Sequence, residues 1–291
     1  MPGTNSITIE LLKKYDFPIQ KKYGQNFLVD DNILQGIVDA AQVSAGDIVL
    51  EIGPGLGALT GRLLRNAGHV AAVEVDRMLI PILNETLADY DNLTLINEDI
   101  LKTDIEAVYQ DICSAHPEFK DSPLKVVANL PYYITTPIIM ELLERQGRIS
   151  SITVMVQKEV AARMNEGPGS KSYGALSLAV QYYARPEYVM TVSRNCFIPK
   201  PDVDSAVVRL DIYEPGNRPV KAKDPDLMFR IIKAAFNKRR KTLVNAVSNA
   251  AGLDISRQEI LNALSCAGLS ENIRGEALTL EQFANLSDII S

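Results

Sequence analysis

Short apolar runs separated by helix-type patterns make up the first two thirds of the chain. Each run is apolar almost throughout rather than at every second position, which is typical of a strand buried on both faces of a sheet. Strands of this kind with helices between them form parallel sheets, because each parallel connection needs a crossover. The sequence therefore predicts a doubly wound, mostly parallel α/β domain. The runs are residues 48–52, 70–75, 93–96, 125–128 and 152–157.

The pattern changes at residues 214–219, where Glu-Pro-Gly-Asn-Arg-Pro is typical of a linker. The segments that follow have helical character only. The chain has 291 residues, which allows one large and one small domain at roughly 100–200 residues per domain. We therefore predict a large domain over residues 1–213, with residues 1–25 as an N-terminal arm, and a small all-α domain over residues 220–291.

Composition narrows the class of protein. Three scattered cysteines, with no Cys-x-x-Cys, and only two histidines argue against a zinc site and a disulfide framework, so we expect no metal. No apolar run approaches the roughly 18 residues of a membrane span, and the first residues lack the apolar stretch of a secretory signal. We expect a cytoplasmic protein with no membrane partner. Because the net charge is −6, any nucleic-acid contact requires a local basic patch.

A glycine-rich loop follows the first apolar run, in Glu51-Ile-Gly-Pro-Gly-Leu-Gly-Ala58. Gly53 and Gly55 allow a sharp turn and the close approach of a ligand. Glu74 ends the second run about 20 positions later, where a carboxylate can accept hydrogen bonds from both ribose hydroxyls of a nucleoside. A nicotinamide dinucleotide site shares these features, so the loop alone leaves that alternative open.

Asp99, after the third run, distinguishes the two classes of cofactor. An acid there can accept a hydrogen bond from an adenine amino group, which dinucleotide folds do not generally need. The loop, Glu74 and Asp99 trace a nucleoside across three consecutive carboxyl strand ends, the expected crevice of such a sheet. S-adenosylmethionine needs no pyrophosphate cradle, and no second nucleotide-binding half is visible. The sequence thus favours a Rossmann-like, S-adenosylmethionine-dependent methyltransferase over a nicotinamide-dependent oxidoreductase.

The stretch Asn129-Leu130-Pro131-Tyr132 follows the fourth run and indicates adenine N6 as the methylated atom. N6 is a poor nucleophile because its lone pair is delocalised into the ring. The Asn129 amide oxygen and the Leu130 carbonyl can accept its two hydrogens, which directs the lone pair toward the methyl group. Pro131 stiffens the turn, and Tyr132 offers a ring for base stacking worth about 1–3 kcal/mol. A simple turn with a packed tyrosine is the alternative interpretation.

From residue 21 onward the chain resembles the ribosomal RNA adenine dimethyltransferases, and most closely their bacterial small-subunit branch. Besides the Asn-Leu-Pro-Tyr stretch, the resemblance rests on Tyr23-Gly-Gln-Asn-Phe-Leu28 and on residues 197–205, which match the family pattern F-x-P-x-P-x-V-x-S. In that family the N-terminal segment closes over the cofactor. The resemblance therefore implies that S-adenosylmethionine contacts the following residues: Asn26, Leu28, Gly53, Glu74, Asp99 and Asn129.

The resemblance also assigns a role to Phe197. In the family, the corresponding ring lies across the target base from the motif tyrosine. Phe197 and Tyr132 would then sandwich an adenine that has left its stack in the RNA. Without the resemblance, the two prolines of residues 197–205 show only a rigid extended loop, and Phe197 would be interpreted as a core residue.

Basic residues gather between Asp226 and Asp254, a stretch without any acidic residue. Phosphate contacts need such a local concentration, whatever the net charge. A solvated helix face is the alternative interpretation, and four consecutive basic residues on a helix could not all face one groove. We favour contact with RNA. The residues are Arg230, Lys233, Lys238, Arg239, Arg240 and Lys241.

The resemblance implies the substrate as well. The family's small-subunit enzyme adds two methyl groups to each of two adjacent adenosines near the 3′ end of small-subunit (16S) ribosomal RNA, in the course of subunit biogenesis. We therefore expect the small ribosomal subunit and its RNA as partners, and a monomeric enzyme. Two alternatives stay open: a large-subunit (23S) adenine methyltransferase of the macrolide-resistance type, and a ribosome-assembly factor whose methylation is secondary. Residues 203–207 and 237–241 favour the small-subunit branch.

Overall fold

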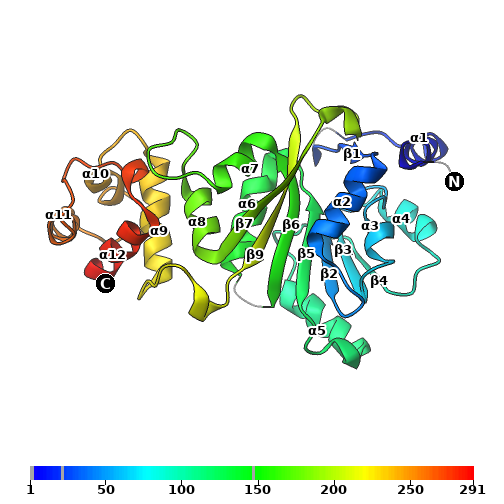
Figure 1. Cartoon of the computed structure of the whole chain (residues 1–291), viewed down its shortest axis with the longest axis horizontal. Helices are drawn as coiled ribbons and strands as arrows, with labels where there is room; N and C mark the ends of the chain where they lie inside the picture. The colour runs from blue at the N-terminus through cyan, green and yellow to red at the C-terminus, as the bar shows by residue number, and fades with distance from the viewer. Residues whose placement is uncertain (1–2, 21–22, 146–147) are drawn as a thin grey trace. The chain divides into compact units, whose positions relative to one another are not determined.

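The computed structural model describes residues 3–20, 23–145 and 148–291. Within this part of the chain, a seven-stranded sheet has the order β4-β3-β2-β5-β6-β9-β7, and β1 pairs separately with β8 (Figure 1). The strands are β1 (Phe27–Leu28), β2 (Ile48–Ile52), β3 (His69–Val73), β4 (Leu93–Ile96), β5 (Leu124–Asn129), β6 (Ile149–Gln157), β7 (Ala184–Val192), β8 (Phe197–Ile198) and β9 (Ser205–Ile212).

Helices connect most of these strands. They are α1 (Thr4–Lys14), α2 (Asp31–Ala41), α3 (Thr60–Leu63), α4 (Ile80–Thr86), α5 (Ile105–Ala115), α6 (Thr135–Glu144), α7 (Lys158–Met164), α8 (Ala175–Tyr183), α9 (Pro225–Asn237), α10 (Leu243–Val247), α11 (Arg257–Cys266) and α12 (Leu280–Ile290). Among the described residues, no helix is both long and apolar enough to cross a membrane.

The strands β4, β3, β2, β5 and β6 are parallel, and β9 is antiparallel to β6. The chain runs outward from β2 to β3 and β4, then returns to the other side of β2 to form β5 and β6. Because crossover connections are right-handed, this reversal places the earlier and later helices on opposite faces of the sheet. The predicted doubly wound, mostly parallel fold is confirmed. Ligands of such sheets bind at the reversal point, here the carboxyl ends of β2 and β5.

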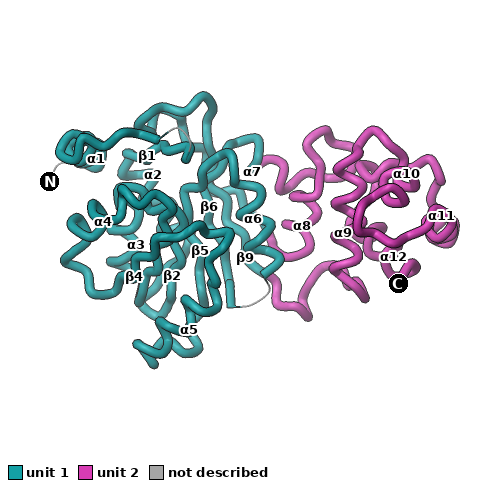
Figure 2. Tube along the Cα trace, turned by 180° about the vertical axis from the view of Figure 1, so that it is seen from behind, with its two compact units in different colours: residues 1–161, 186–212 teal, residues 162–185, 213–291 magenta. Residues whose placement is uncertain are grey.

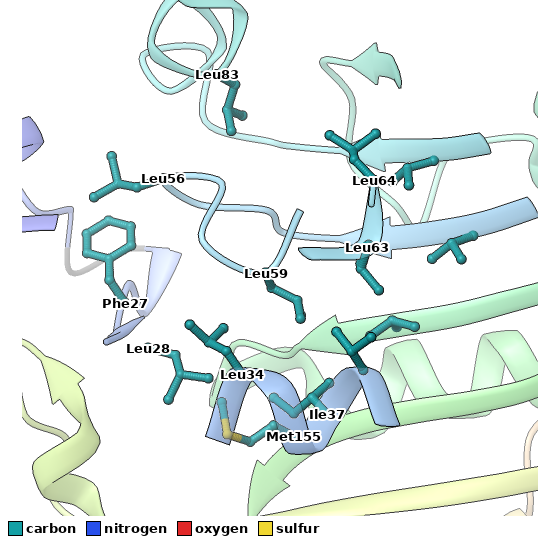
Figure 3. Packing of buried hydrophobic residues seen from close by; sticks show 14 of the residues in the cluster. Phe27, Leu28, Leu34, Ile37, Leu56, Leu59, Leu63, Leu64, Leu83 and Met155 are labelled. Carbon is teal, nitrogen blue, oxygen red and sulfur yellow. The ribbon is translucent and has the colours of Figure 1, made fainter. Parts of the chain in front are cut away.

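Apolar packing against the sheet explains the position of α2. The helix begins after Asp30, whose carboxylate accepts hydrogen bonds from two backbone N–H groups of the first turn. Its apolar side chains recur at helical spacing and face the sheet. Figure 3 shows Leu34 and Ile37 of α2 gathered with Leu59 and Met155 in the core. This packing supports the carboxyl end of the sheet, where the predicted site residues lie.

The chain forms two compact units (Figure 2). Unit 1 comprises Met1–Ala161 and Pro186–Ile212, and unit 2 comprises Ala162–Arg185 and Tyr213–Ser291. The sequence pattern places residues 162–185 in the large domain, whereas the structure groups them with the C-terminal helices. Hydrogen bonds within unit 2 explain the difference: the Tyr173 hydroxyl donates to the Leu278 carbonyl at 2.8 Å, and the Gly169 N–H donates to the Glu276 carbonyl at 2.9 Å.

Candidate active site

A cavity of about 340 Å³ lies at the carboxyl ends of β2, β3, β4 and β5 in unit 1. Its volume is in the range of small-molecule sites, which run from about 300 to 1,000 Å³. The wall contains nearly all of the predicted cofactor and catalytic residues. These are Asn26, Leu28, Gly53, Gly55, Glu74, Asp99, Asn129, Leu130, Pro131 and Tyr132.

The glycine loop adopts a backbone that other residues rarely take. Gly53 has a φ of 68° and Gly55 a φ of 60°, both in the left-handed region. A Cβ on Gly53 would have no neighbour within 4 Å, whereas one on Gly55 would lie 3.2 Å from the Phe27 ring. The loop thus leaves open space at Gly53 and lets the N-terminal segment approach closely at Gly55.

Glu74 follows β3 and is almost fully buried at the cavity wall, with 5% exposure. Its carboxylate accepts hydrogen bonds from the backbone N–H groups of Asp76, at 2.8 Å, and Gly55, at 3.3 Å. Burial raises the pKa of Glu74 to about 7 despite these bonds. The carboxylate is therefore tied to the glycine loop, in place to meet hydroxyl donors of a ligand.

Glu51 is a second buried acid in the cavity wall, at 1% exposure within the otherwise apolar strand β2. Burial raises the pKa of Glu51 to about 8, and the nearby Glu74 carboxylate acts in the same direction. Within the described part of the chain, its Oε2 atom has no hydrogen-bond partner. Such a buried acceptor is unfavourable without a donor from a ligand.

The high pKa of Glu51 makes stability depend on pH. Folding raises the pKa from 4.5 to about 8, so the folded state binds the proton more tightly and loses stability as pH rises through this window. We expect Glu51→Gln, measured without cofactor, to raise the melting temperature at pH 8 by about 3 °C. The gain should shrink toward pH 5 in thermal unfolding followed by circular dichroism. A gain that does not vary with pH, or an equal gain in the exposed control Glu271→Gln, would contradict this cause.

Asn129 ends β5, and its side chain joins two parts of the cavity wall. Its Nδ2 donates to the Asn26 carbonyl at 3.2 Å, which leaves the amide oxygen as the acceptor of this side chain. The next residue, Leu130, is held by its N–H, which donates to the Met155 carbonyl at 3.1 Å. Pro131 has φ −60° and ψ 132°, an extended conformation that ends the strand. The backbone around the two predicted acceptors is thus well supported.

Tyr132 and Phe197 differ in position. The half-buried Tyr132 lines the cavity, and its hydroxyl lies 2.7 Å from the Ser205 hydroxyl. Phe197 is 4% exposed in β8, pairs with Leu28 of β1 and belongs to the hydrophobic core. The structure therefore does not place Phe197 at the cavity, because β1–β8 pairing holds it in the core. Its role opposite Tyr132 stays a prediction.

The predicted RNA-binding residues lie in unit 2. The four consecutive basic residues lie in the turn between α9 and α10, and not in a helix. They are therefore not distributed around a helix axis, as a helix over this stretch would require. These residues are Lys238, Arg239, Arg240 and Lys241. Arg239 is half-buried and pairs with Glu276 at 3.4 Å, whereas the others are exposed. Arg230 and Lys233 are exposed on α9. Contact with RNA stays a prediction.

The cavity wall also contains residues to which the sequence analysis gave no role. Tyr23, Glu51 and Tyr133 all line it. A signal existed for Glu51, since a lone carboxylate interrupts an apolar strand. Tyr133 directly follows the Asn-Leu-Pro-Tyr stretch and is 56% exposed, but a second tyrosine in sequence has no distinctive pattern.

Comparison with known proteins identifies the family. The model of the family described as ribosomal RNA adenine dimethylase matches residues 17–291. The chain belongs to this family. It is 55% identical over 289 residues to a ribosomal RNA small subunit methyltransferase A of Lachnoclostridium phytofermentans, covering 99% of this chain and 97% of that one. The prediction of an S-adenosylmethionine-dependent methyltransferase is confirmed.

Solved structures agree with the fold. A dimethyladenosine transferase from Plasmodium falciparum superposes with a TM-score of 0.70 at 27% identity, covering 89% of this chain and 95% of that one. The 23S rRNA methyltransferase ErmE superposes with a TM-score of 0.63 at 25% identity, covering 91% and 99%. This fold thus occurs in a structure named for 23S rRNA, whereas the relative from Lachnoclostridium phytofermentans is named for the small subunit.

The residues of the cavity fit S-adenosylmethionine. This cofactor presents hydrogen-bond donors at its adenine amino group, its ribose hydroxyls and its ammonium group. The wall offers acceptor oxygens on the carboxyl groups of Glu51, Glu74 and Asp99, of which Glu51 has a buried oxygen without a partner among the described residues. The open space at Gly53 admits a ligand next to the backbone. Acceptors in the wall and donors on the cofactor are therefore complementary.

Proposed function

We propose that the protein dimethylates N6 of two adjacent adenosines near the 3′ end of small-subunit ribosomal RNA, with S-adenosylmethionine as methyl donor, during small-subunit biogenesis. One observation carries the proposal. Asn129, Leu130 and Tyr132 line the same cavity as Glu74 and Asp99, the two proposed acceptors for a nucleoside. Support for the small subunit comes from the name of the relative that is 55% identical over almost the whole chain.

In this proposal, the wall residues bind and orient both reactants. Glu74 accepts from the ribose and Asp99 from the adenine of the cofactor, which supplies an electrophilic methyl group. The amide oxygen of Asn129 and the carbonyl of Leu130 accept the two N6 hydrogens of the target adenine. The lone pair of N6 then points along the line of transfer. The N6–methyl bond would form as the methyl–sulfur bond breaks, S-adenosylhomocysteine would leave, and the methylated N6 would release a proton to water. Catalysis then comes mainly from positioning. No residue needs to form a covalent bond to the RNA.

The target base and the RNA backbone need further contacts. Tyr132 stacks on the adenine, and its hydroxyl contact with Ser205 fixes the ring orientation. Phosphates of the RNA contact the exposed basic residues of unit 2. These residues are most concentrated in the turn between α9 and α10. The enzyme acts as a monomer in the cytoplasm; light scattering that gives the mass of two chains would contradict the monomer.

The test of this proposal is transfer of labelled methyl groups to unmethylated small and large ribosomal subunits, offered separately, followed by nucleoside analysis. We expect N6-dimethyladenosine in small-subunit RNA, at two adjacent positions. Label only in large-subunit RNA would keep the chemistry and replace the substrate. No label in either subunit, with the cofactor bound, would overturn the catalytic proposal and favour an assembly role.

A further inference from the structure

Asp76 is a buried acid two residues beyond Glu74, with 2% exposure and no assigned role. Its two carboxylate oxygens share Gln20 as a partner and differ in their other partner. Oδ1 accepts from the backbone N–H of Met78 at 3.1 Å, a local turn contact that many aspartates make, and also from the Gln20 side-chain amide at 3.3 Å. Oδ2 accepts from the side-chain amides of Gln25, at 2.8 Å, and Gln20, at 3.0 Å. Oδ1 therefore supports the turn, and Oδ2 makes the shorter contacts with both glutamines.

Gln25 belongs to residues 23–28, which wall the cavity, and Gln20 lies before them in the chain. The Gln20 N–H donates to the Gln25 side-chain oxygen at 2.8 Å, so that the pair and Asp76 form one hydrogen-bonded group. Gln25 lines the cavity, and Gln20 does not. Directly after Gln25, the carbonyl of Asn26 receives the Asn129 bond at 3.2 Å. The segment is thus attached at two points, to Asp76 after β3 and to Asn129 after β5.

Asp76 is also connected to the proposed ribose acceptor. Its backbone N–H donates to Oε1 of Glu74 at 2.8 Å. Two buried carboxylates so close in the chain are unfavourable unless each has donors. The amides of Gln20 and Gln25 supply donors to Asp76, and a hydrogen bond to an ionised acceptor is stronger than a neutral one. The position of the N-terminal segment and the position of Glu74 therefore depend on the same short turn.

We propose that Asp76 is a positioning residue that holds residues 23–28 as a wall over the cofactor, through its hydrogen bonds to Gln20 and Gln25. The inference rests on the proposed function for the identity of the cofactor, but not on the RNA target. A wall held in place slows escape of the bound molecule. Loss of the contact should therefore weaken binding of the cofactor and leave the transfer step almost unchanged once cofactor is saturating.

The variant Asp76→Asn tests this, because it keeps one oxygen as acceptor for Met78 and replaces Oδ2, which accepts from both glutamine amides, with an NH2 group that cannot accept. Calorimetry with S-adenosylhomocysteine should give a dissociation constant raised about tenfold. Amide hydrogen exchange in residues 23–28 should become faster, while kcat at saturating cofactor stays within about twofold of wild type. Unchanged affinity together with unchanged exchange would overturn the proposal.

Two further variants separate this role from a general effect on folding. Asp104→Asn alters another aspartate with a local contact, the cap of α5, and should change neither affinity nor exchange. Gln20→Ala removes the hydrogen bonds of Gln20 to Asp76 and changes no residue of the cavity wall. It should reproduce part of the Asp76→Asn effect. The double variant should bind no more weakly than Asp76→Asn alone. Strictly additive effects would contradict a shared contact. Should the wild type fail to bind S-adenosylhomocysteine, the proposed function falls, while exchange in residues 23–28 still tests the contact.

Discussion

Replacing Asn129 with alanine should lower kcat for methyl transfer by about 100-fold or more, the usual effect of removing one preorganised hydrogen-bonding group from a reaction centre. The change removes the proposed acceptor for an N6 hydrogen. It also removes the Nδ2 donor that bonds the Asn26 carbonyl. The measurement is labelled methyl transfer to small subunits at saturating cofactor.

A control variant and a binding measurement are needed to interpret the result for Asn129→Ala. The exposed residue Asn84 on α4 provides a matched control, and Asn84→Ala should keep the wild-type rate. Binding of S-adenosylhomocysteine, measured in parallel, separates a lost acceptor from a collapsed cofactor site. Full activity of Asn129→Ala would eliminate the acceptor role. A defect confined to cofactor affinity would assign Asn129 to the wall and leave N6 activation to other groups.

Replacing Gly55 with valine should weaken cofactor binding by about 30-fold or more. A left-handed backbone costs an ordinary residue about 1–2 kcal/mol, and a β-branched residue is a genuine outlier there. The new Cβ would also lie 3.2 Å from the Phe27 ring, in the segment that walls the cavity. The backbone strain and the contact with Phe27 can be relieved only if the glycine loop or residues 23–28 move. Either movement disturbs Glu74, because its carboxylate accepts from the Gly55 N–H.

The expected loss of affinity in Gly55→Val is measured by calorimetry, as the dissociation constant of S-adenosylhomocysteine. Gly216→Val is the matched control, because its Cβ would meet nothing within 4 Å and its backbone is not in the left-handed region. Circular dichroism should show that both variants fold. Wild-type affinity in Gly55→Val would mean that the loop tolerates a different backbone and does not shape the cofactor site.

Much of the cofactor site was predictable from the sequence. Buried parallel strands appear as continuous apolar runs, so their ends can be located within a few residues. A residue that follows such a run must lie at the carboxyl edge of the sheet, which is why the sequence alone predicts that Gly53, Glu74, Asp99 and Asn129 lie together. The order of strands was not needed for this step, since all carboxyl ends meet at one edge.

The pairing that buries Phe197 and the unit to which residues 162–185 belong could not be predicted in this way. Phe197 follows a loop rather than a long strand, and its burial depends on pairing between β1 and β8, which are 170 residues apart as counted from Phe27 to Phe197. Residues 162–185 include α8 and the first two residues of β7, yet Tyr173 bonds to Leu278 in the C-terminal unit. Such pairings depend on the packing of distant segments, for which a single sequence has no periodic signal.

The sequence by itself determined the fold class and the edge of the sheet at which the predicted site residues lie together. These properties depend on residues close together in the chain or on the rule that parallel strands share an edge. Only the tertiary structure decided that Glu51 Oε2 is buried without a partner among the described residues, that pairing between β1 and β8 holds Phe197, and that Asp76 binds Gln20 and Gln25. The physical reason is that burial and long-range hydrogen bonds depend on which distant segments meet, and local sequence patterns do not specify that.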